Sequence, residues 1–241
     1  MVEISKSPSE ILNVLLAATT KSKISMGVLK LTGETHRWTT TRNFSDLVVR
    51  HTEIPSHHNL VERLNIEIQH LVQIQCELMA RDGILIRGGL CIKDCYIDEE
   101  FIFGPGLIQS YRLESQIAVF PRIVIDDEIV ELPLGGQLWG PSIRRGEDAA
   151  YFIDYLYAGC KSLGGFSSTS FATKSALLAS HKEKIETKLR ESSNEGSERL
   201  NERAKQKLLW AALYHNSVVS RLIEEKEDLA LSLKIQEGLL R

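Results

Sequence analysis

The sequence predicts a mixed core of helices and strands, of the α+β or α/β class, followed by a helical C-terminal extension. Helical and strand-like patterns alternate as far as about residue 130, which is typical of a core built from both kinds of element. The composition then changes to a loop punctuated by Gly and Pro, and later to a helical pattern. The chain has 241 residues, of which 43% are apolar, so it can bury a sizeable core. We expect a core domain over residues 1–132, a Gly/Pro-rich connection with a short helix over residues 133–169, and a helical extension over residues 170–241.

The first half of the core should contain two helices with a strand pair between them. Residues 7–20 begin with a capping sequence and continue with apolar residues at helical spacing. Residues 36–51 are rich in Thr and Val, which suits two short strands that meet near Asp46. Residues 59–79 carry an apolar stripe at helical spacing, and Gly83 should end that helix.

The second half of the core should form a strand, a hairpin, a helix and a further strand. Residues 84–92 read as a strand that is interrupted by Gly88 and Gly89. A polar hairpin follows, and the sequence FGPG then begins a short helix that should run to about Ile117. Residues 123–126 (IVID) are expected to form the last strand of this part.

The C-terminal extension should consist of two helices, over residues 170–191 and from about Glu198 onward. It would either cover the core or pair with another copy of the chain. Trp210, Tyr214 and His215 fall near one face of the second helix. We interpret them as residues that pack this helix against the core, with His215 hydrogen-bonded.

Composition excludes several classes of protein. The net charge of −3 provides no basic surface for nucleic acid. No apolar run approaches the ~20 residues of a membrane span, and we expect a cytoplasmic protein with reduced cysteines. Cys91 and Cys95 have no second pair to complete a zinc site and are interpreted as a packing or partly exposed pair. The adjacent His57 and His58 are interpreted as a solvated pair, not as metal ligands.

Two segments carry candidate chemistry. In the sequence NFSDLVV, Asp46 places a carboxylate in an otherwise apolar strand, where it could cap a turn, pair with a cation or bind a metal. On these residues alone we favour the turn cap. The Gly-rich sequence from residue 103 to 106 could present free amides to an anion at a helix start. A bulged strand followed by a surface helix is the simpler interpretation of Gly88, Gly89 and this turn, and we favour it.

Five segments in order, NFSDLVV, IRGG, FGPGLIQSYRLES, FPRIVI and WAALYHN, resemble bacterial proteins of the class III nucleotidyl cyclase family. The chain looks most like the branch with the pyrimidine (uridylate and cytidylate) cyclases of antiphage defence, over about residues 8 to 218. The resemblance implies a ferredoxin-like βαββαβ core. These enzymes have a further Asp on an opening strand, in a phrase like F-x-D-x-x-G-F. Only MVEISK precedes the first helix here, so either the start lies upstream or the core lacks its first strand and one metal ligand.

The resemblance also implies roles for three residues. Asp46 falls where the family places a carboxylate ligand of Mg²⁺ or Mn²⁺, ions that prefer oxygen donors. This match makes metal binding the preferred interpretation of Asp46. Phe44 would lie beside the nucleotide. Arg112 falls at the position of the transition-state arginine, and in the homodimer of this family it would serve the metal bound by the other subunit's Asp46.

The predicted function is therefore a homodimeric second-messenger synthase. It would convert a nucleoside triphosphate, UTP or CTP, to its 3′,5′-cyclic monophosphate and pyrophosphate. The alternative is a non-catalytic nucleotide-binding or dimerisation module that kept the fold and lost a metal ligand. The missing opening strand favours this alternative, whereas Asp46, Arg112 and the Gly-Pro turn favour the enzyme.

Overall fold

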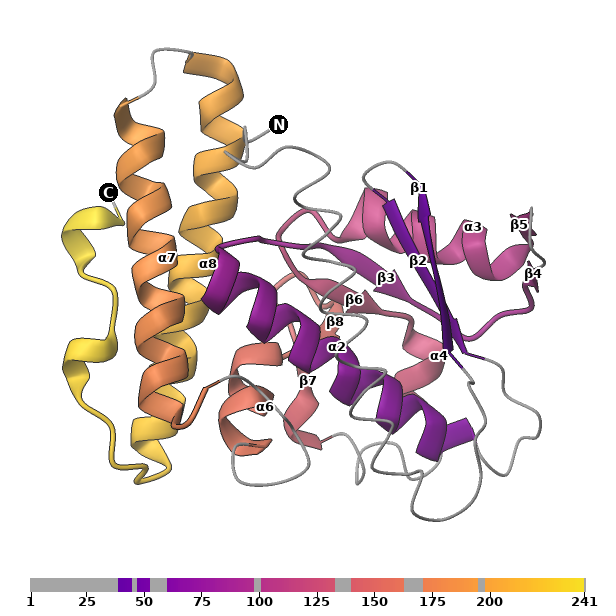
Figure 1. Ribbon diagram of the computed structural model, residues 1–241, viewed down its shortest axis with the longest axis horizontal. Helices are drawn as coiled ribbons and strands as arrows, with labels where there is room; N and C mark the ends of the chain where they lie inside the picture. The colour runs from indigo at the N-terminus through magenta and orange to yellow at the C-terminus, as the bar shows by residue number, and fades with distance from the viewer. Residues whose placement is uncertain are drawn as a thin grey trace.

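The computed structural model describes residues 39–44, 47–52, 60–97, 101–132, 140–162, 171–194 and 198–240. Within these ranges the chain is an α+β protein built around a small mixed sheet, with two long helices at its C-terminal end (Figure 1). The expected helix over residues 7–20, Asp46 and the pair His57 and His58 lie outside the described residues. The predicted division of the chain at residues 132 and 169 stays a prediction, and so does the specific ferredoxin-like arrangement of a cyclase.

The strand pair predicted near Asp46 is present. Strands β1 (Thr39–Phe44) and β2 (Leu47–Thr52) pair antiparallel, and Phe44 and Leu47 are the partners at the turn end. The two strands form a sheet of their own and pair with no other strand in the described part of the chain.

A four-stranded sheet lies at the centre of the fold, in the order β3-β6-β8-β7. Strands β3 and β6 run parallel, whereas β8 is antiparallel to both β6 and β7. The strand predicted over residues 84–92 is present as β3 but is shorter than expected. Strands β7 and β8 come from the segment over residues 133–169, which we interpreted as a Gly/Pro-rich connection. The bounds are β3 (Gly88–Leu90), β6 (Ile123–Ile125), β7 (Ile143–Arg145) and β8 (Tyr151–Ile153).

The connection from β3 to β6 carries a hairpin and a helix. The helix α3 continues directly into a π-helical turn and lies on β3, where close approach is possible because Gly89 has no side chain. A Cβ at Gly89 would lie 2.4 Å from the Ser110 carbonyl oxygen and 2.5 Å from the Leu113 Cβ. The connection consists of β4 (Tyr96–Ile97), β5 (Ile102–Phe103), α3 (Pro105–Arg112) and the π-helical turn η3 (Leu113–Ile117).

The sheet is covered on both sides. Val124 of β6 packs with Leu113 of η3, whereas its neighbours Ile123 and Ile125 pack in the main core with α2. This alternation is what a strand with two buried faces requires. Helices α2 and α6 supply much of that core, and Figure 1 shows α2 running across the sheet. The remaining elements of this part are α2 (Leu60–Asp82), α4 (Asp127–Val130), η4 (Gly140–Ser142) and α6 (Tyr155–Ser162).

The C-terminal extension packs on the chain's own core. Helices α7 (Lys174–Asn194) and α8 (Glu198–Glu224) lie side by side (Figure 1). The Trp210 ring stacks on Phe120 with 5.6 Å between centroids, and the Tyr214 hydroxyl donates to Asp154 Oδ1 at 2.8 Å. The predicted packing role of this face is confirmed. Two short turns follow, η5 (Leu231–Leu233) and η6 (Glu237–Leu239).

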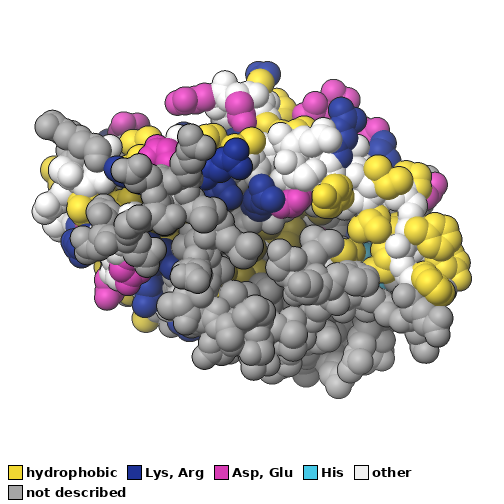
Figure 2. Space-filling model, turned by 90° about the horizontal axis from the view of Figure 1, so that it is seen from above, with side chains coloured by type: hydrophobic (Ala, Val, Ile, Leu, Met, Phe, Trp, Pro, Cys, Tyr) yellow, Lys and Arg dark blue, Asp and Glu magenta, His cyan; other side chains and the backbone are white. Residues whose placement is uncertain are grey.

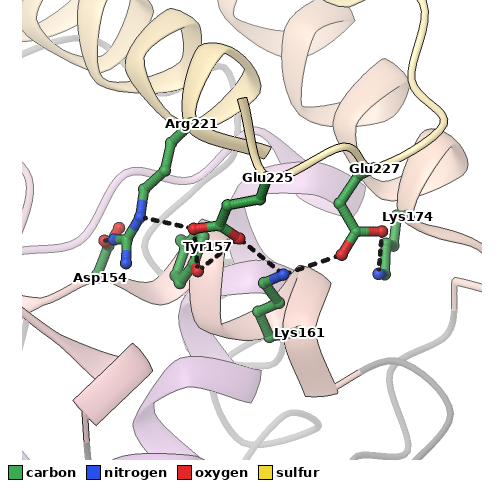
Figure 3. Close-up of polar contacts among 7 residues, drawn as sticks. All are labelled: Asp154, Tyr157, Lys161, Lys174, Arg221, Glu225 and Glu227. Atoms are coloured by element: carbon green, nitrogen blue, oxygen red, sulfur yellow. Dashed lines mark hydrogen bonds and ion pairs between the residues drawn. The ribbon is translucent and has the colours of Figure 1, made fainter. Parts of the chain in front are cut away.

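Charged side chains join the end of α8 to α6 and to the start of α7 (Figure 3). The Arg221 guanidinium lies 3.6 Å from the centre of the Tyr157 ring and 3.4 Å from Asp154 Oδ2. Lys161 pairs with Glu225 at 2.7 Å and with Glu227 at 2.9 Å, and Lys174 also pairs with Glu227. Most of these groups are partly exposed, so water screens each pair and a single pair contributes little to stability. Together they set where the chain leaves α8.

Candidate functional site

The hairpin that carries Asp46 is anchored to α2 by an ion pair. Arg50 of β2 contacts Glu67 with two nitrogens, one of them 3.1 Å from Glu67 Oε2, and its NH2 also lies 3.2 Å from His70 Nδ1. Burial alone would raise the pKa of Glu67, but the hydrogen bonds and charges of His70 and Arg50 lower it to about 2. We did not predict this cluster from the sequence, because its members are 17 and 20 residues apart and have no common motif.

The structure describes part of Phe44 and nothing of Asp46. Phe44 is the last residue of β1, and the structure describes its backbone. Its side chain is outside the described part of the structure. Asp46 itself lies outside the described residues, in the chain between Phe44 of β1 and Leu47 of β2. Their roles in nucleotide and metal binding stay predictions.

Arg112 is the last residue of α3, and its side chain is exposed. It forms no ion pair or hydrogen bond within the residues that the structure describes. Glu114 lies two residues after Arg112 in the sequence, but it pairs with Arg87 at 2.5 Å and not with Arg112. The guanidinium of Arg112 is therefore available to an anion.

The helix that carries Arg112 is held rigidly. Leu113, its next residue, is buried between β3 and β6, and Gln109 donates to Asp126 Oδ2 at 2.7 Å. At the other end, a Cβ on Gly106 would lie 2.9 Å from the Lys93 carbonyl oxygen. The start of α3 packs against the hairpin and its end packs against the sheet. The backbone that carries Arg112 is therefore held in place.

The start of α3 does not offer a row of free amides. Pro105 has no N–H, and the Gly106 amide donates to the Asp94 carbonyl at 2.9 Å. The Ile108 amide donates to Gly104 in the ordinary way. The geometry agrees with the simpler interpretation of this Gly-rich turn, in which small residues permit close packing.

Exposed apolar side chains gather around α3 and the neighbouring hairpin. Ile108 is 70% exposed and Tyr111 is 60% exposed, next to Arg112 in the sequence. The rings of Tyr96 and Phe103 stack on the hairpin with 4.7 Å between centroids. Figure 2 shows hydrophobic side chains at the end of the molecule where Figure 1 places these elements. We call this surface the α3 face, and it consists of Tyr96, Phe101, Phe103, Ile108 and Tyr111.

Three of the four cysteines are at least partly buried, whereas Cys95 is exposed. All four are free, and the Cys91 thiol donates to the Gly106 carbonyl at 3.3 Å. Burial and the charge of Asp126 raise the pKa of Cys91 to about 11, so it is not a thiolate at neutral pH. No group of three or more metal-ligating side chains occurs among the described residues. The predicted Mg²⁺ or Mn²⁺ site thus depends on Asp46.

Comparison with known proteins adds no family to these observations. No protein-family model matches the chain, and neither the curated proteins nor the solved structures include a significant match. Over the described ranges, none of the helices has both the length and the apolar character that crossing a bilayer requires.

Proposed function

We propose that this protein is a nucleotidyl cyclase that acts on UTP or CTP as a homodimer and serves antiphage defence. The observation that carries the proposal is Arg112, a free and exposed guanidinium on a helix that is packed firmly against the sheet. The proposal also rests on the ordered sequence segments that resemble the cyclase family.

Ring closure places specific demands on such a site. The ribose 3′ oxygen attacks the α-phosphorus, and pyrophosphate leaves with the bonding electron pair. Negative charge develops on the phosphoryl oxygens, and the planar fork of an arginine can bind two of them at once. An arginine on a firmly packed helix suits this role, because a preorganised charge need not reorganise during the reaction. Mg²⁺ or Mn²⁺ bound at Asp46 would supply the Lewis acidity that activates the 3′ hydroxyl.

The surroundings of Arg112 support the proposal of a homodimer. Its neighbours Ile108 and Tyr111 expose apolar surface that a monomer would leave in water. Pairing of two α3 faces would bury these side chains and bring each Arg112 to the subunit interface. In that arrangement Arg112 serves the nucleotide bound near the partner's hairpin.

A dimerisation module without catalysis is the second candidate. The α3 face favours it as strongly as it favours the enzyme, because an apolar interface needs no chemistry.

Complementation between mutant subunits distinguishes the two. Asp46→Ala and Arg112→Ala should each abolish formation of cyclic nucleotide, and a refolded mixture should recover part of the activity because a heterodimer contains one intact site. Arg87→Ala is the matched control, since Arg87 lies close by but is already paired with Glu114. No recovery, with subunit exchange confirmed, would exclude a shared site. No activity in the wild type with any nucleoside triphosphate would favour the dimerisation module.

A further inference from the structure

The C-terminal strap, defined as residues 227–240, lies along the outer side of α7 and α8 (Figure 1). It is held by side chains that bind its backbone. Lys182 donates to the Ser232 carbonyl at 2.8 Å, and Asn216 both donates to and accepts from the backbone of Ile235, at 3.0 and 2.7 Å. The Ile235 side chain is buried in an apolar cluster that also contains Met79, Ile185, Leu189, Leu208, Ala211 and Ala212.

A chain of hydrogen bonds connects the strap to the core through two buried histidines. His215 Nε2 lies 2.9 Å from the Leu233 carbonyl oxygen, and His215 Nδ1 lies 3.1 Å from His181 Nδ1. His181 Nε2 lies 2.8 Å from the hydroxyl of Tyr155. Neither histidine is accessible to solvent.

These contacts determine where each proton lies. The Leu233 carbonyl can only accept, so His215 Nε2 must carry a proton and donate it. A neutral His215 then has a bare Nδ1, which accepts from Nδ1–H of His181. A neutral His181 in turn accepts at Nε2 from the Tyr155 hydroxyl. A proton added to His215 would place its Nδ1–H opposite the Nδ1–H of His181, so this contact is satisfied only while the His215 ring is neutral.

The surroundings resist that added proton. Burial lowers the pKa of His181. Burial and, to a smaller extent, the charge of Lys182 lower the pKa of His215 to about 4, although the hydrogen bond to Leu233 raises it. Asp154, which faces this region from the start of α6, is bound to Tyr214 and Arg221, not to either ring. The groups that contact Tyr155 from α2 and α8 are the neutral Cys76 and Tyr214.

We propose that the C-terminal strap is an acid-released latch: a proton on His215 Nδ1 has no acceptor while the ring faces His181, so acid favours the state in which the strap has left α7 and α8 and His215 is solvated. The solvent-exposed histidine of the open state accepts the proton that the closed state excludes. The other charged contacts of the strap respond at a different pH, because the hydrogen bonds of Lys174 and Lys161 lower the pKa of Glu227 to about 2.

Hydrogen exchange of the full-length chain tests the latch. With an open-state pKa of 6.5 and a closed-state pKa of about 4 for His215, the protection of the amides around Ile235 should fall roughly 20-fold between pH 7 and pH 5, after correction for intrinsic exchange. The central turns of α8 should keep their protection over the same range. Equal protection of the strap at both pH values would overturn the proposal, and so would a simultaneous loss in α8, which would mean general unfolding.

Two variants separate titration from simple loosening of the strap. His215→Gln keeps an N–H donor and an oxygen acceptor but does not titrate, so the pH dependence of strap protection should disappear. Asn216→Ala removes two strap contacts without removing a titratable group, so protection should be lower at every pH while the pH dependence persists. Persistence of the full pH dependence in His215→Gln, or its loss in Asn216→Ala, would contradict the latch.

Discussion

Gly89 and Leu113 are in direct contact: a Cβ added to Gly89 would lie 2.5 Å from the Leu113 Cβ, closer than such atoms come in folded proteins. The helix that carries Arg112 therefore depends on a glycine in the strand beneath it. Packing of the helix on the strand explains why the strand has a glycine at position 89.

Gly89→Ala should destabilise the protein by about 1–3 kcal/mol, because the helix must move away from β3 to admit the methyl group. Gly88→Ala is the matched control, since its Cβ would meet only the Ile123 side chain, at 3.4 Å. The free energy of unfolding from urea titration measures both. Equal effects of the two substitutions would contradict the close packing of α3 on Gly89. We also expect Gly89→Ala to lower the proposed cyclase activity, because it would displace Arg112.

Asp46→Ala should abolish the formation of cyclic nucleotide and weaken Mn²⁺ binding in the presence of nucleotide, while leaving the fold intact. This follows if the carboxylate is a metal ligand. Removal of a turn cap would instead lower stability by about 1 kcal/mol and leave turnover unchanged. Thermal unfolding and product assays on the same sample decide between the roles. A variant that unfolds early but still forms product would eliminate the metal assignment.

Ile108→Glu should dissociate the proposed homodimer. A carboxylate buried without a partner in the interface costs about 3 kcal/mol or more, which weakens association roughly 100-fold. Leu213→Glu is the control, because Leu213 is 59% exposed on α8, outside the α3 face. Sedimentation equilibrium provides the association constants. The dimer assignment fails if the wild type is monomeric at assay concentrations, or if both substitutions weaken association equally.

The stability of the protein should fall as the pH drops from 6.5 to about 4. In this window the unfolded chain binds a proton at His215, whose pKa there is 6.5, whereas the folded protein does not because its pKa is about 4. The unfolded state therefore gains protons first, and the loss reaches about 3 kcal/mol at pH 4. His181, also lowered by burial, acts in the same direction.

Urea midpoints measured from pH 8 to pH 3 provide the check. His215→Gln should flatten the curve between pH 6.5 and pH 4.5. The contribution of Glu67 belongs to a lower window, since its pKa is lowered from 4.5 to about 2 and its stabilisation disappears only as the pH falls through that range. A wild-type midpoint that is constant between pH 7 and pH 4.5 would show that the histidines are not held neutral.

Much of the helical structure could be predicted from the sequence, because it depends on patterns within one segment. The apolar stripe that begins at Leu60 predicted α2, and α2 ends just before Gly83 as expected. The two C-terminal helices begin within a few residues of the predicted positions. The hairpin β1–β2 and the order of strand, hairpin, helix and strand between residues 84 and 126 were also apparent. In each case a local period or a turn residue carries the signal.

The candidate site could be predicted only in part. The sequence alone identified Arg112 by resemblance, and only the tertiary structure decided that its side chain is exposed while Glu114 pairs with Arg87. The anchor of Arg50 on Glu67 has no local signal either, because the two residues lie on separate elements. Such pairs depend on where the elements pack, and a pattern within one element does not contain that information.

Strands β7 and β8 illustrate the same limit for the fold. Each has three residues and lies in a segment that is rich in Gly and Pro, so neither is long enough to establish an alternating pattern. They are strands because β8 finds β6 as a partner and buries Phe152 and Ile153 in the core. The sequence by itself determined the helices, whose hydrogen bonds close within a few residues. Only the tertiary structure decided the sheet edge and the His181–His215 pair, because both require groups far apart in the chain to meet.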